Sequence, residues 1–211
     1  MTTTLLIVFA IASVVVLLRA ERLGFRTLAY TAKPLALVSI ALIPVFNPAP
    51  VSSEYRLLIL VGLALSLPGD ILLMLPKDRF LAGLFAFLLA HGAYSAAFVG
   101  RLDAVPILPM LPYAVALAFT VKLLWPHLGR LRWAVLFYGL ALALMASLAL
   151  GVATEVGGRS AILAAAGAAL FVLSDTALAF DRFLGGYDAA RYAILWPYFG
   201  AQLLLALSVA A

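Results

Sequence analysis

The 211-residue sequence contains no cysteine and few charged residues. Asp, Glu, Lys and Arg make up 11% of it, against about 25% in a typical soluble domain. The absence of cysteine excludes disulfides, thiolate metal sites and thiol nucleophiles. Because 66% of the residues are hydrophobic, an ordinary soluble domain is excluded, and no room is left for an extramembrane catalytic, nucleotide-binding or DNA-reading domain.

The sequence consists instead of long apolar runs, each near the length of about 20 residues that a membrane helix needs. Ten-residue alternating segments, which a membrane β-barrel requires, are absent. We therefore predict an all-α polytopic membrane protein, a bundle of eight transmembrane helices in one integral membrane domain, 1–211. The predicted helices cover about 2–18, 28–46, 57–75, 81–100, 104–124, 133–152, 161–180 and 189–210.

The basic residues predict the orientation of this bundle. Ten of them fall in the odd-numbered connections: Arg19, Arg22, Arg26, Lys77, Arg79, Lys122, Arg130, Arg132, Arg182 and Arg191. The even-numbered connections hold only Arg56, Arg101 and Arg159. Since Lys and Arg favour cytoplasmic loops, we expect cytoplasmic odd connections and both termini outside. The basic residues are scattered singly, so we expect no nucleic-acid partner and no obligatory protein partner.

Two segments half a chain apart resemble each other. Gly-Asp at 69–70 followed by Asp-Arg-Phe at 78–80 has a counterpart in Ser-Asp at 174–175 followed by Asp-Arg-Phe at 181–183. The aspartates that end the two pairs are 105 residues apart, with four predicted helices between them. A duplication would give two parallel four-helix repeats, 1–103 and 104–211, with both aspartates at one depth. Chance similarity in an Ala- and Leu-rich chain is the alternative.

Polar groups inside the predicted helices mark a candidate site, because an ionisable group at membrane depth costs roughly 2.5–3.5 kcal/mol. Lys33, Asp70, His91 and Asp175 all fall at or near one depth on the cytoplasmic side, where they could line one cavity. Further polar side chains lie beside these residues or at helical spacing near them: Ser66, Tyr94, Ser174, Tyr198 and Gln202.

Each of these residues also has a structural interpretation. Lys33 could snorkel to the lipid head groups, and His91 could be a neutral, hydrogen-bonded packing residue. The two tyrosines and Gln202 could link helices, and Ser174 could bond to its own helix. The aspartates fit a structural role less well, because one lysine cannot fully neutralise two carboxylates.

Two carboxylates in a partly desolvated pocket can supply an acid and a base, since one tends to keep its proton while the other stays ionised. Glycosidases use such a pair around an oxocarbenium-like state. No serine lies in a nucleophile-elbow context, and a single intramembrane histidine makes a zinc site improbable, so we expect no metal and no organic cofactor. A substrate entering from the bilayer would be a single-chain lipid.

Taken together, these motifs resemble the YhhN-like lysoplasmalogenase family of eight-span membrane proteins. The resemblance extends over essentially the whole chain. It is carried by Ser66 to Asp70 followed by His91 and Tyr94, by Ser174-Asp175, by Lys33-Pro34, and by Tyr198 with Gln202.

The resemblance implies hydrolysis of the vinyl ether bond of a lysoplasmalogen, or of a related lysophospholipid, to a fatty aldehyde and a glycerophospho head group. One of Asp70 and Asp175 would donate a proton and the other would activate water, with Lys33 or His91 biasing the pair. The remaining polar residues would hold water or the glycerophosphate.

The expected location is a bacterial inner (plasma) membrane, with the mouth of the site toward the cytoplasm, and the expected partners are the lysophospholipid substrate and membrane lipids. Two other functions stay open. One is a proton-coupled small-molecule or lipid transporter, since intramembrane carboxylates and parallel repeats also serve carriers. The other is a non-catalytic lipid-binding or scaffolding protein.

Overall fold

The computed structural model describes residues 2–187 and 189–211. Within these ranges the chain is all-α, as predicted, and forms eight long helices. Their bounds are α1 Thr2–Leu23, α2 Arg26–Val45, α3 Ser53–Met74, α4 Phe80–Val99, α5 Ile107–Leu124, α6 Arg132–Glu155, α7 Gly158–Leu184 and α8 Ala190–Leu207. Two 3₁₀ turns, η1 Trp125–His127 and η2 Gly129–Leu131, join α5 to α6.

Seven of the eight helices are long and apolar enough to cross a membrane, namely α1 to α7. The protein is therefore a polytopic helical bundle of the membrane. Among the described residues, α8 is the one long helix that does not reach this threshold of length and apolarity; it carries Arg191, Tyr198 and Gln202 and packs against α7, α2 and α1. The polar side chains of α8 are thus found in a helix packed inside the bundle, where polar groups can be paired with other helices.

Helices α1 and α7 extend four to five residues beyond the predicted ends at 18 and 180. Arg19 and Arg182 end the apolar runs but are compatible with helical backbone. The helices stop only at Gly24 and Gly185, whose φ angles of 76° and 97° lie in the left-handed region that favours glycine. Charge marks the membrane boundary here, whereas glycine sets the helix ends.

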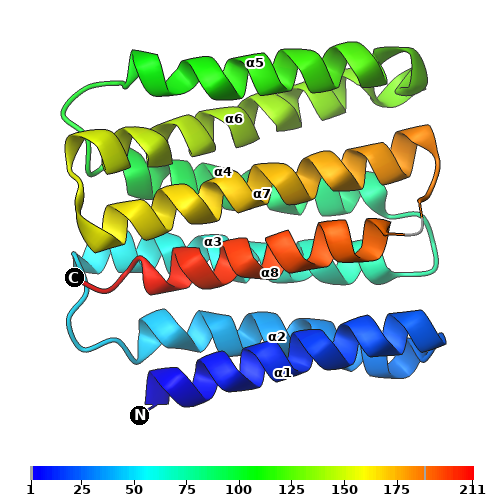
Figure 1. Ribbon diagram of the computed structural model, residues 1–211, viewed down its shortest axis with the longest axis horizontal. Coiled ribbons are helices and arrows are strands. Elements are labelled where there is room, and N and C mark those ends of the chain that lie inside the picture. The colour runs from blue at the N-terminus through cyan, green and yellow to red at the C-terminus, as the bar shows by residue number, and fades with distance from the viewer. Residues whose placement is uncertain (1, 188) are drawn as a thin grey trace.

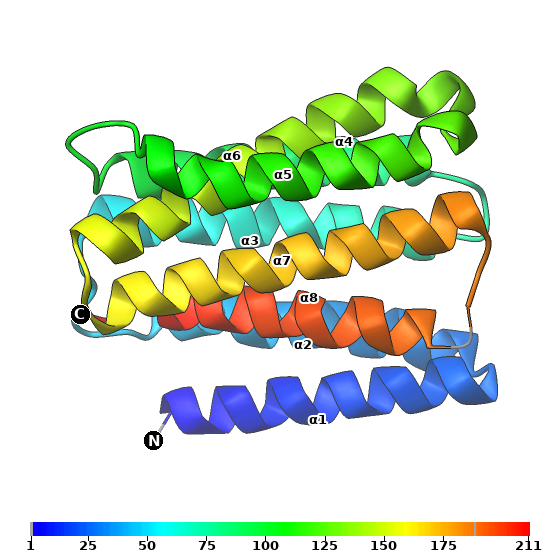
Figure 2. The same cartoon turned by 45° about the horizontal axis from the view of Figure 1, so that its top comes forward.

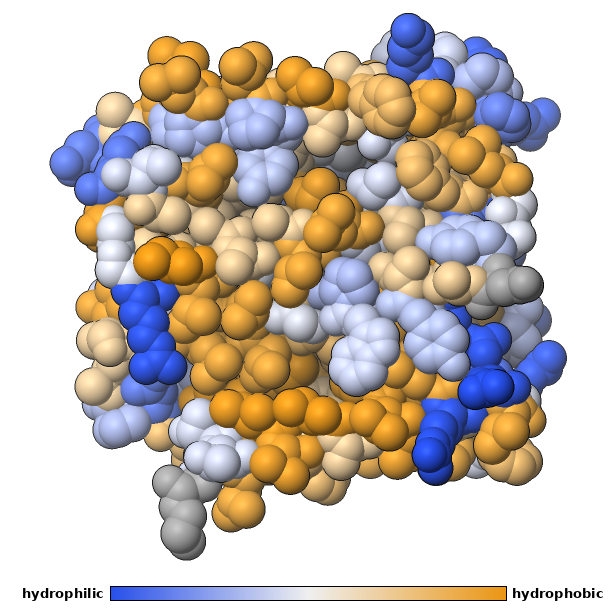
Figure 3. Space-filling view, viewed as in Figure 1, coloured by the Kyte–Doolittle hydropathy of each residue, from blue (hydrophilic) through white to orange (hydrophobic). Residues whose placement is uncertain are grey.

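The helices lie roughly parallel to one long axis, and the odd-numbered ones all run in the same direction (Figure 1). Helix α1 begins, and the chain ends, at the same end of the bundle. Figure 1 places α1 and α2 at the bottom, α5 and α6 at the top, and the remaining four helices between them. In Figure 2, which turns the bundle by 45°, α2 lies behind α8, on which it packs. Side chains on the face seen in Figure 3 are largely apolar over the middle, and the strongly hydrophilic ones gather at the two ends.

The two halves share much of their packing. Helix α2 packs on α3 and α8, and its counterpart α6 packs on α7 and α4. The outer helices break this pattern, because α1 contacts α8 whereas α5 contacts α7. The common packing agrees with parallel repeats, and a duplication with halves 1–103 and 104–211 stays a prediction.

The end of the bundle that holds the termini is closed by a polar network. Arg101 donates to Ser160, Ser160 donates to the backbone oxygen of Ser208, and the Tyr55 hydroxyl lies 2.8 Å from Ser208 Oγ. The Arg101 guanidinium also stacks over the Tyr55 ring, 4.8 Å from its centroid. These contacts join α3, α7, α8 and the loop that follows α4.

Candidate active site

Helix α3 carries Asp70 and is held close to α4 by two glycines. A Cβ atom at Gly62 would lie 2.1 Å from the Tyr94 ring, and one at Gly69 would lie 2.7 Å from the Phe87 ring. Only a residue without a side chain permits this approach. The aromatic residues of α4 therefore cover the face of α3 beside Asp70 and limit the access of water to it.

Asp70 is 1% exposed and has two partners from different helices. Its Oδ1 atom lies 2.9 Å from Lys33 Nζ of α2, and its Oδ2 accepts a hydrogen bond of 2.5 Å from the Tyr198 hydroxyl of α8. Lys33 is itself buried, so the interpretation that it snorkels to the head groups is wrong. The ion pair offsets part of the cost of burying each charge.

A chain of hydrogen bonds continues from Asp70 into the bundle. The Tyr198 hydroxyl accepts from Gln202 Nε2 at 3.1 Å, and Gln202 Oε1 accepts from the Tyr94 hydroxyl at 2.8 Å. These side chains link α4, α8 and α3 as the structural interpretation expects. They also orient the Tyr198 hydroxyl that donates to Asp70. The same contacts therefore fit both the structural interpretation and a role in the candidate site.

Asp175 lies at the equivalent place on α7 and has a different partner. Its Oδ2 accepts a short hydrogen bond from the Tyr138 hydroxyl of α6, and the residue is only half-buried. Sequence reasoning missed Tyr138. A signal was present, because Tyr138 follows Lys33 by 105 residues, the same offset that separates Asp70 from Asp175.

The other predicted residues have mainly packing contacts. Ser66 donates to its own helix at Gly62 O, whereas Ser174 donates to Ile194 O of α8, so the interpretation that Ser174 bonds to its own helix is wrong. His91 is fully buried, and neither ring nitrogen has a hydrogen-bond partner among the residues that the structure describes. The interpretation of His91 as a hydrogen-bonded packing residue is therefore also wrong. Its ring packs on Tyr138 and Phe171.

One cavity of about 1060 Å³, which we call the polar cavity, brings five of the nine predicted residues together: Lys33, Asp70, Ser174, Asp175 and Tyr198. The other four, Ser66, His91, Tyr94 and Gln202, are fully buried and outside its lining. Residues of the α1–α2, α3–α4 and α7–α8 connections border the cavity, so its mouth lies at the end with the odd-numbered connections, opposite the termini.

Charged residues surround this mouth. Arg26 and Arg191 line it together with Glu21 and Asp181, and Arg191 Nε lies 3.5 Å from a Glu21 carboxylate oxygen. Within residues 2–187 and 189–211, no group of three His, Cys, Asp or Glu side chains is placed to hold a metal ion. The arrangement can bind an anionic group at the mouth and present two differently partnered carboxylates farther in.

Comparison with known proteins places this site in a family. The model of the YhhN family matches residues 28–209, which include all nine predicted site residues. A Mycobacterium bovis protein named lysoplasmalogenase is 34% identical over 170 residues, 74% of this chain and 61% of the relative. The Sus scrofa protein named lysoplasmalogenase TMEM86B is 37% identical over 148 residues, 70% of this chain and 61% of the relative.

An Escherichia coli protein named uncharacterized membrane protein YhhN is 31% identical over 115 residues, 54% of each chain. This chain thus covers about three fifths of the length of the first two relatives and about half of the third. No solved structure matches the chain significantly. Because the family model spans most of the sequence, including both intramembrane aspartates, the chain belongs to the YhhN family.

Proposed function

We propose that this protein hydrolyses the vinyl ether bond of a lysoplasmalogen, or of a closely related lysophospholipid, with Asp70 and Asp175 as its acid–base pair. The observation that carries the proposal is that both aspartates line one cavity and have chemically different partners. The names of the mycobacterial and mammalian relatives support the choice of substrate.

Asp175 is the proton donor in this proposal. It forms no ion pair with a residue in the described ranges, and a carboxyl group without a cation nearby is suited to carry a proton. Because Tyr138 donates into Oδ2, the Oδ1 atom is left to hold that proton. Asp175 transfers it to the β-carbon of the vinyl ether, which leaves an oxocarbenium ion at the α-carbon.

Asp70 acts on the water molecule that completes the reaction. Lys33 stabilises Asp70 as a carboxylate, which accepts a proton from water as the oxygen attacks the α-carbon. The product of this step is a hemiacetal. Its hydroxyl proton passes to the ether oxygen as the bond between that oxygen and the α-carbon breaks, giving a fatty aldehyde and a glycerophospho alcohol. One water molecule is consumed, and the cycle closes when Asp70 releases its proton to water of the polar cavity and Asp175 takes one up.

The mouth of the cavity suits the head group of such a lipid. Arg26 and Arg191 supply cationic donors that can bind a phosphodiester, whereas Glu21 and Asp181 can face an ammonium group. We place this mouth on the cytoplasmic side, because the loops around it are the ones rich in basic residues.

The decisive experiment is mass spectrometry of the products formed from a lysoplasmalogen in D₂O. Protonation of carbon predicts one deuterium on the carbon next to the aldehyde group, and rapid reduction to the alcohol traps it. Release of a fatty acid, or of an aldehyde without deuterium on that carbon, would overturn the mechanism. Absence of any cleavage across a panel of lysolipids would overturn the function.

A transporter would need the cavity to open at both ends in turn. The network of Tyr55, Arg101, Ser160 and Ser208 at the other end supports a single mouth and favours the enzyme. Since the chain has no cysteine, one introduced at Met74, which lines the cavity, can be probed cleanly. The enzyme predicts labelling from the cytoplasmic side only, and labelling from both sides would favour transport.

A scaffolding protein would neutralise its buried carboxylates and leave no space beside them. Asp175 has a phenol as its partner, and the cavity next to it has a volume of about 1060 Å³. Both features favour a protein that binds a substrate at this place.

A further inference from the structure

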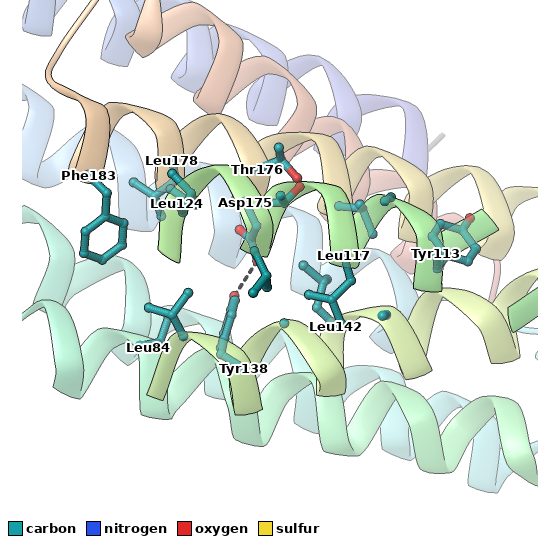
Figure 4. Close-up of a pocket in the computed structure, with 18 of the residues that line it drawn as sticks. Leu84, Tyr113, Leu117, Leu124, Tyr138, Leu142, Asp175, Thr176, Leu178 and Phe183 are labelled. Carbon is teal, nitrogen blue, oxygen red and sulfur yellow. Dashed lines mark hydrogen bonds between the residues drawn. The ribbon is translucent and has the colours of Figure 1, made fainter. Parts of the chain in front are cut away.

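A second hollow lies on the other side of Asp175, between α5, α6 and α7 with α4 at one end (Figure 4). Its walls are mostly aliphatic and aromatic, and we call it the apolar slot. Its volume of about 80 Å³ is much smaller than that of the polar cavity. In Figure 4, Tyr138 and Asp175 meet across it through their hydrogen bond.

Asp175 and Leu178 are the only residues in the linings of both hollows within the described parts of the chain. One turn of α7 therefore separates a polar, charged space from an apolar one. A molecule with its polar part in the first and its apolar part in the second would have the junction between the two parts at Asp175. In a lysoplasmalogen, that junction is the vinyl ether.

The wall of the slot formed by α5 is held by few contacts. Leu124 is the only buried residue of α5, whereas α1, its counterpart in the first half, has six. Most residues of α5 are exposed, and Leu108 is 83% exposed. A helix packed so loosely can shift outward at small cost and admit a chain from the bilayer.

We propose that the apolar slot binds the hydrocarbon chain of a single-chain lipid whose phosphorylated head group occupies the polar cavity. This inference rests on the proposed function and adds the binding mode to it. In this binding mode, the β-carbon of the vinyl ether, which carries the chain, lies beside Asp175, the proton donor. The α-carbon, which is bonded to the ether oxygen, faces the water of the polar cavity. The small volume of the slot, enlarged by an outward shift of α5, suits one hydrocarbon chain and not the two chains of a diacyl lipid.

The first test compares two alanines of α5 that differ in where they point. Both are exposed, but Ala116 lines the slot and Ala118 does not. We expect the ring of Ala116→Phe to reduce the space in the slot. Since each buried methylene contributes about fourfold to binding, KM for a 16-carbon substrate should rise about tenfold or more. KM for a 6-carbon substrate should change less than about twofold. Ala118→Phe should match the wild type with both.

A second variant, on α6, tests whether the dependence on chain length comes from the slot and not from a change in α5 alone. Gly139 of α6 also lines the slot, and a Cβ atom there would lie 2.5 Å from a methyl group of Leu117. Gly139→Leu should therefore give the same dependence on chain length. Equal effects on both substrate lengths in the two slot variants, or no effect in either, would overturn the inference.

Photo-crosslinking supplies a measurement that needs no catalysis. A 1-O-alkyl lysophospholipid with a diazirine at the chain end should label α5 and α6 next to the slot, and Ala116→Phe should reduce that labelling while Ala118→Phe does not. Labelling spread over the lipid-facing helices would overturn the chain site. If the slot is labelled but no lysolipid is cleaved, the proposed function fails and the binding site stands.

Discussion

Asp70 and Asp175 lie 105 residues apart, the offset of the predicted repeat, but have unlike partners. Asp70 pairs with Lys33, and Asp175 pairs with Tyr138. Both partners precede their aspartates by 37 residues. Asp70 also accepts a hydrogen bond from Tyr198, whereas Tyr138 is the one hydrogen-bond partner of the Asp175 side chain among the described residues. Two buried aspartates can therefore serve two roles, because a lysine favours an ionised carboxylate, whereas a phenol leaves its carboxylate without a compensating charge.

The helix packing near the Asp70–Lys33 pair is also more polar than the packing near the Asp175–Tyr138 pair. Gly62 of α3 packs against the Tyr94 ring, whereas Gly167, 105 residues later on α7, packs against Leu205 and the backbone oxygen of Ala201. Both glycines allow close helix packing, but only the first brings a hydroxyl group into the interior. A chain of hydrogen bonds from Tyr94 through Gln202 and Tyr198 therefore reaches Asp70. The aliphatic side chain beside Gly167 cannot form such a chain, and Asp175 borders the apolar slot instead.

The largest expected effect is that of Asp175→Asn, which removes the proposed proton donor. We expect kcat for aldehyde release to fall about 10³-fold, within the range for loss of a general acid, while the protein stays folded. Asp103→Asn, at the opposite end of the bundle, is the matched control and should retain wild-type turnover. Full activity of Asp175→Asn would remove Asp175 from the mechanism.

Breaking the ion pair in the first half should mainly affect stability. Lys33→Met leaves Asp70 buried without its cation, which costs about 3–5 kcal/mol in comparable cases. Thermal unfolding in detergent should show a large decrease in Tm. The double variant Lys33→Met with Asp70→Asn should recover most of the Tm but not the activity. A Lys33→Met protein as stable as the wild type would contradict the structural importance of this pair.

The corresponding change in the second half should have a smaller effect. Tyr138→Phe removes the hydroxyl that orients Asp175, and we expect kcat/KM to fall about tenfold, in line with loss of one hydrogen bond to a carboxyl group. Tyr55→Phe, which removes a hydroxyl at the closed end, should leave kcat/KM unchanged. Equal losses in the two variants would indicate a general effect of removing phenols.

The smallest expected effect concerns the contact between the two Asp-Arg-Phe motifs. Arg182 donates a hydrogen bond of 2.5 Å to Asp78, and the Phe80 and Phe183 rings pack edge to face. The Arg182 hydrogen bond, and then that from the Phe80 backbone, hold the pKa of Asp78 below its ordinary value of 3.8. The resulting stabilisation is present above that value and is lost as the pH falls through the lower pKa of the folded state.

Asp78→Asn should therefore lower the Tm slightly at neutral pH, and the difference from the wild type should vanish in strong acid. Both side chains are exposed, so the effect should also decrease with added salt. A difference in Tm that grows as the pH falls would contradict this assignment.

Much of the fold could be predicted from the sequence because apolar run length is a local property. The eight helices were found in this way, and the ends of α1 and α7 were missed because their last turns carry charge that a helix tolerates. The candidate site was found because ionisable residues are rare in such runs. Tyr138 was missed because a tyrosine in a membrane helix has many ordinary roles, and only the offset from Lys33 distinguishes it.

Hydropathy and burial cost depend on residue type, so the order of residues was enough to predict the class of the protein, its eight helices and two intramembrane carboxylates. The tertiary structure decided which carboxylate meets the lysine, that both line one cavity, and that Asp175 also borders an apolar slot. Those features depend on how helices far apart in the chain rotate and pack against one another. The glycines and aromatic side chains that set this packing contact residues of other helices, and such contacts cannot be deduced from the order of residues along one helix.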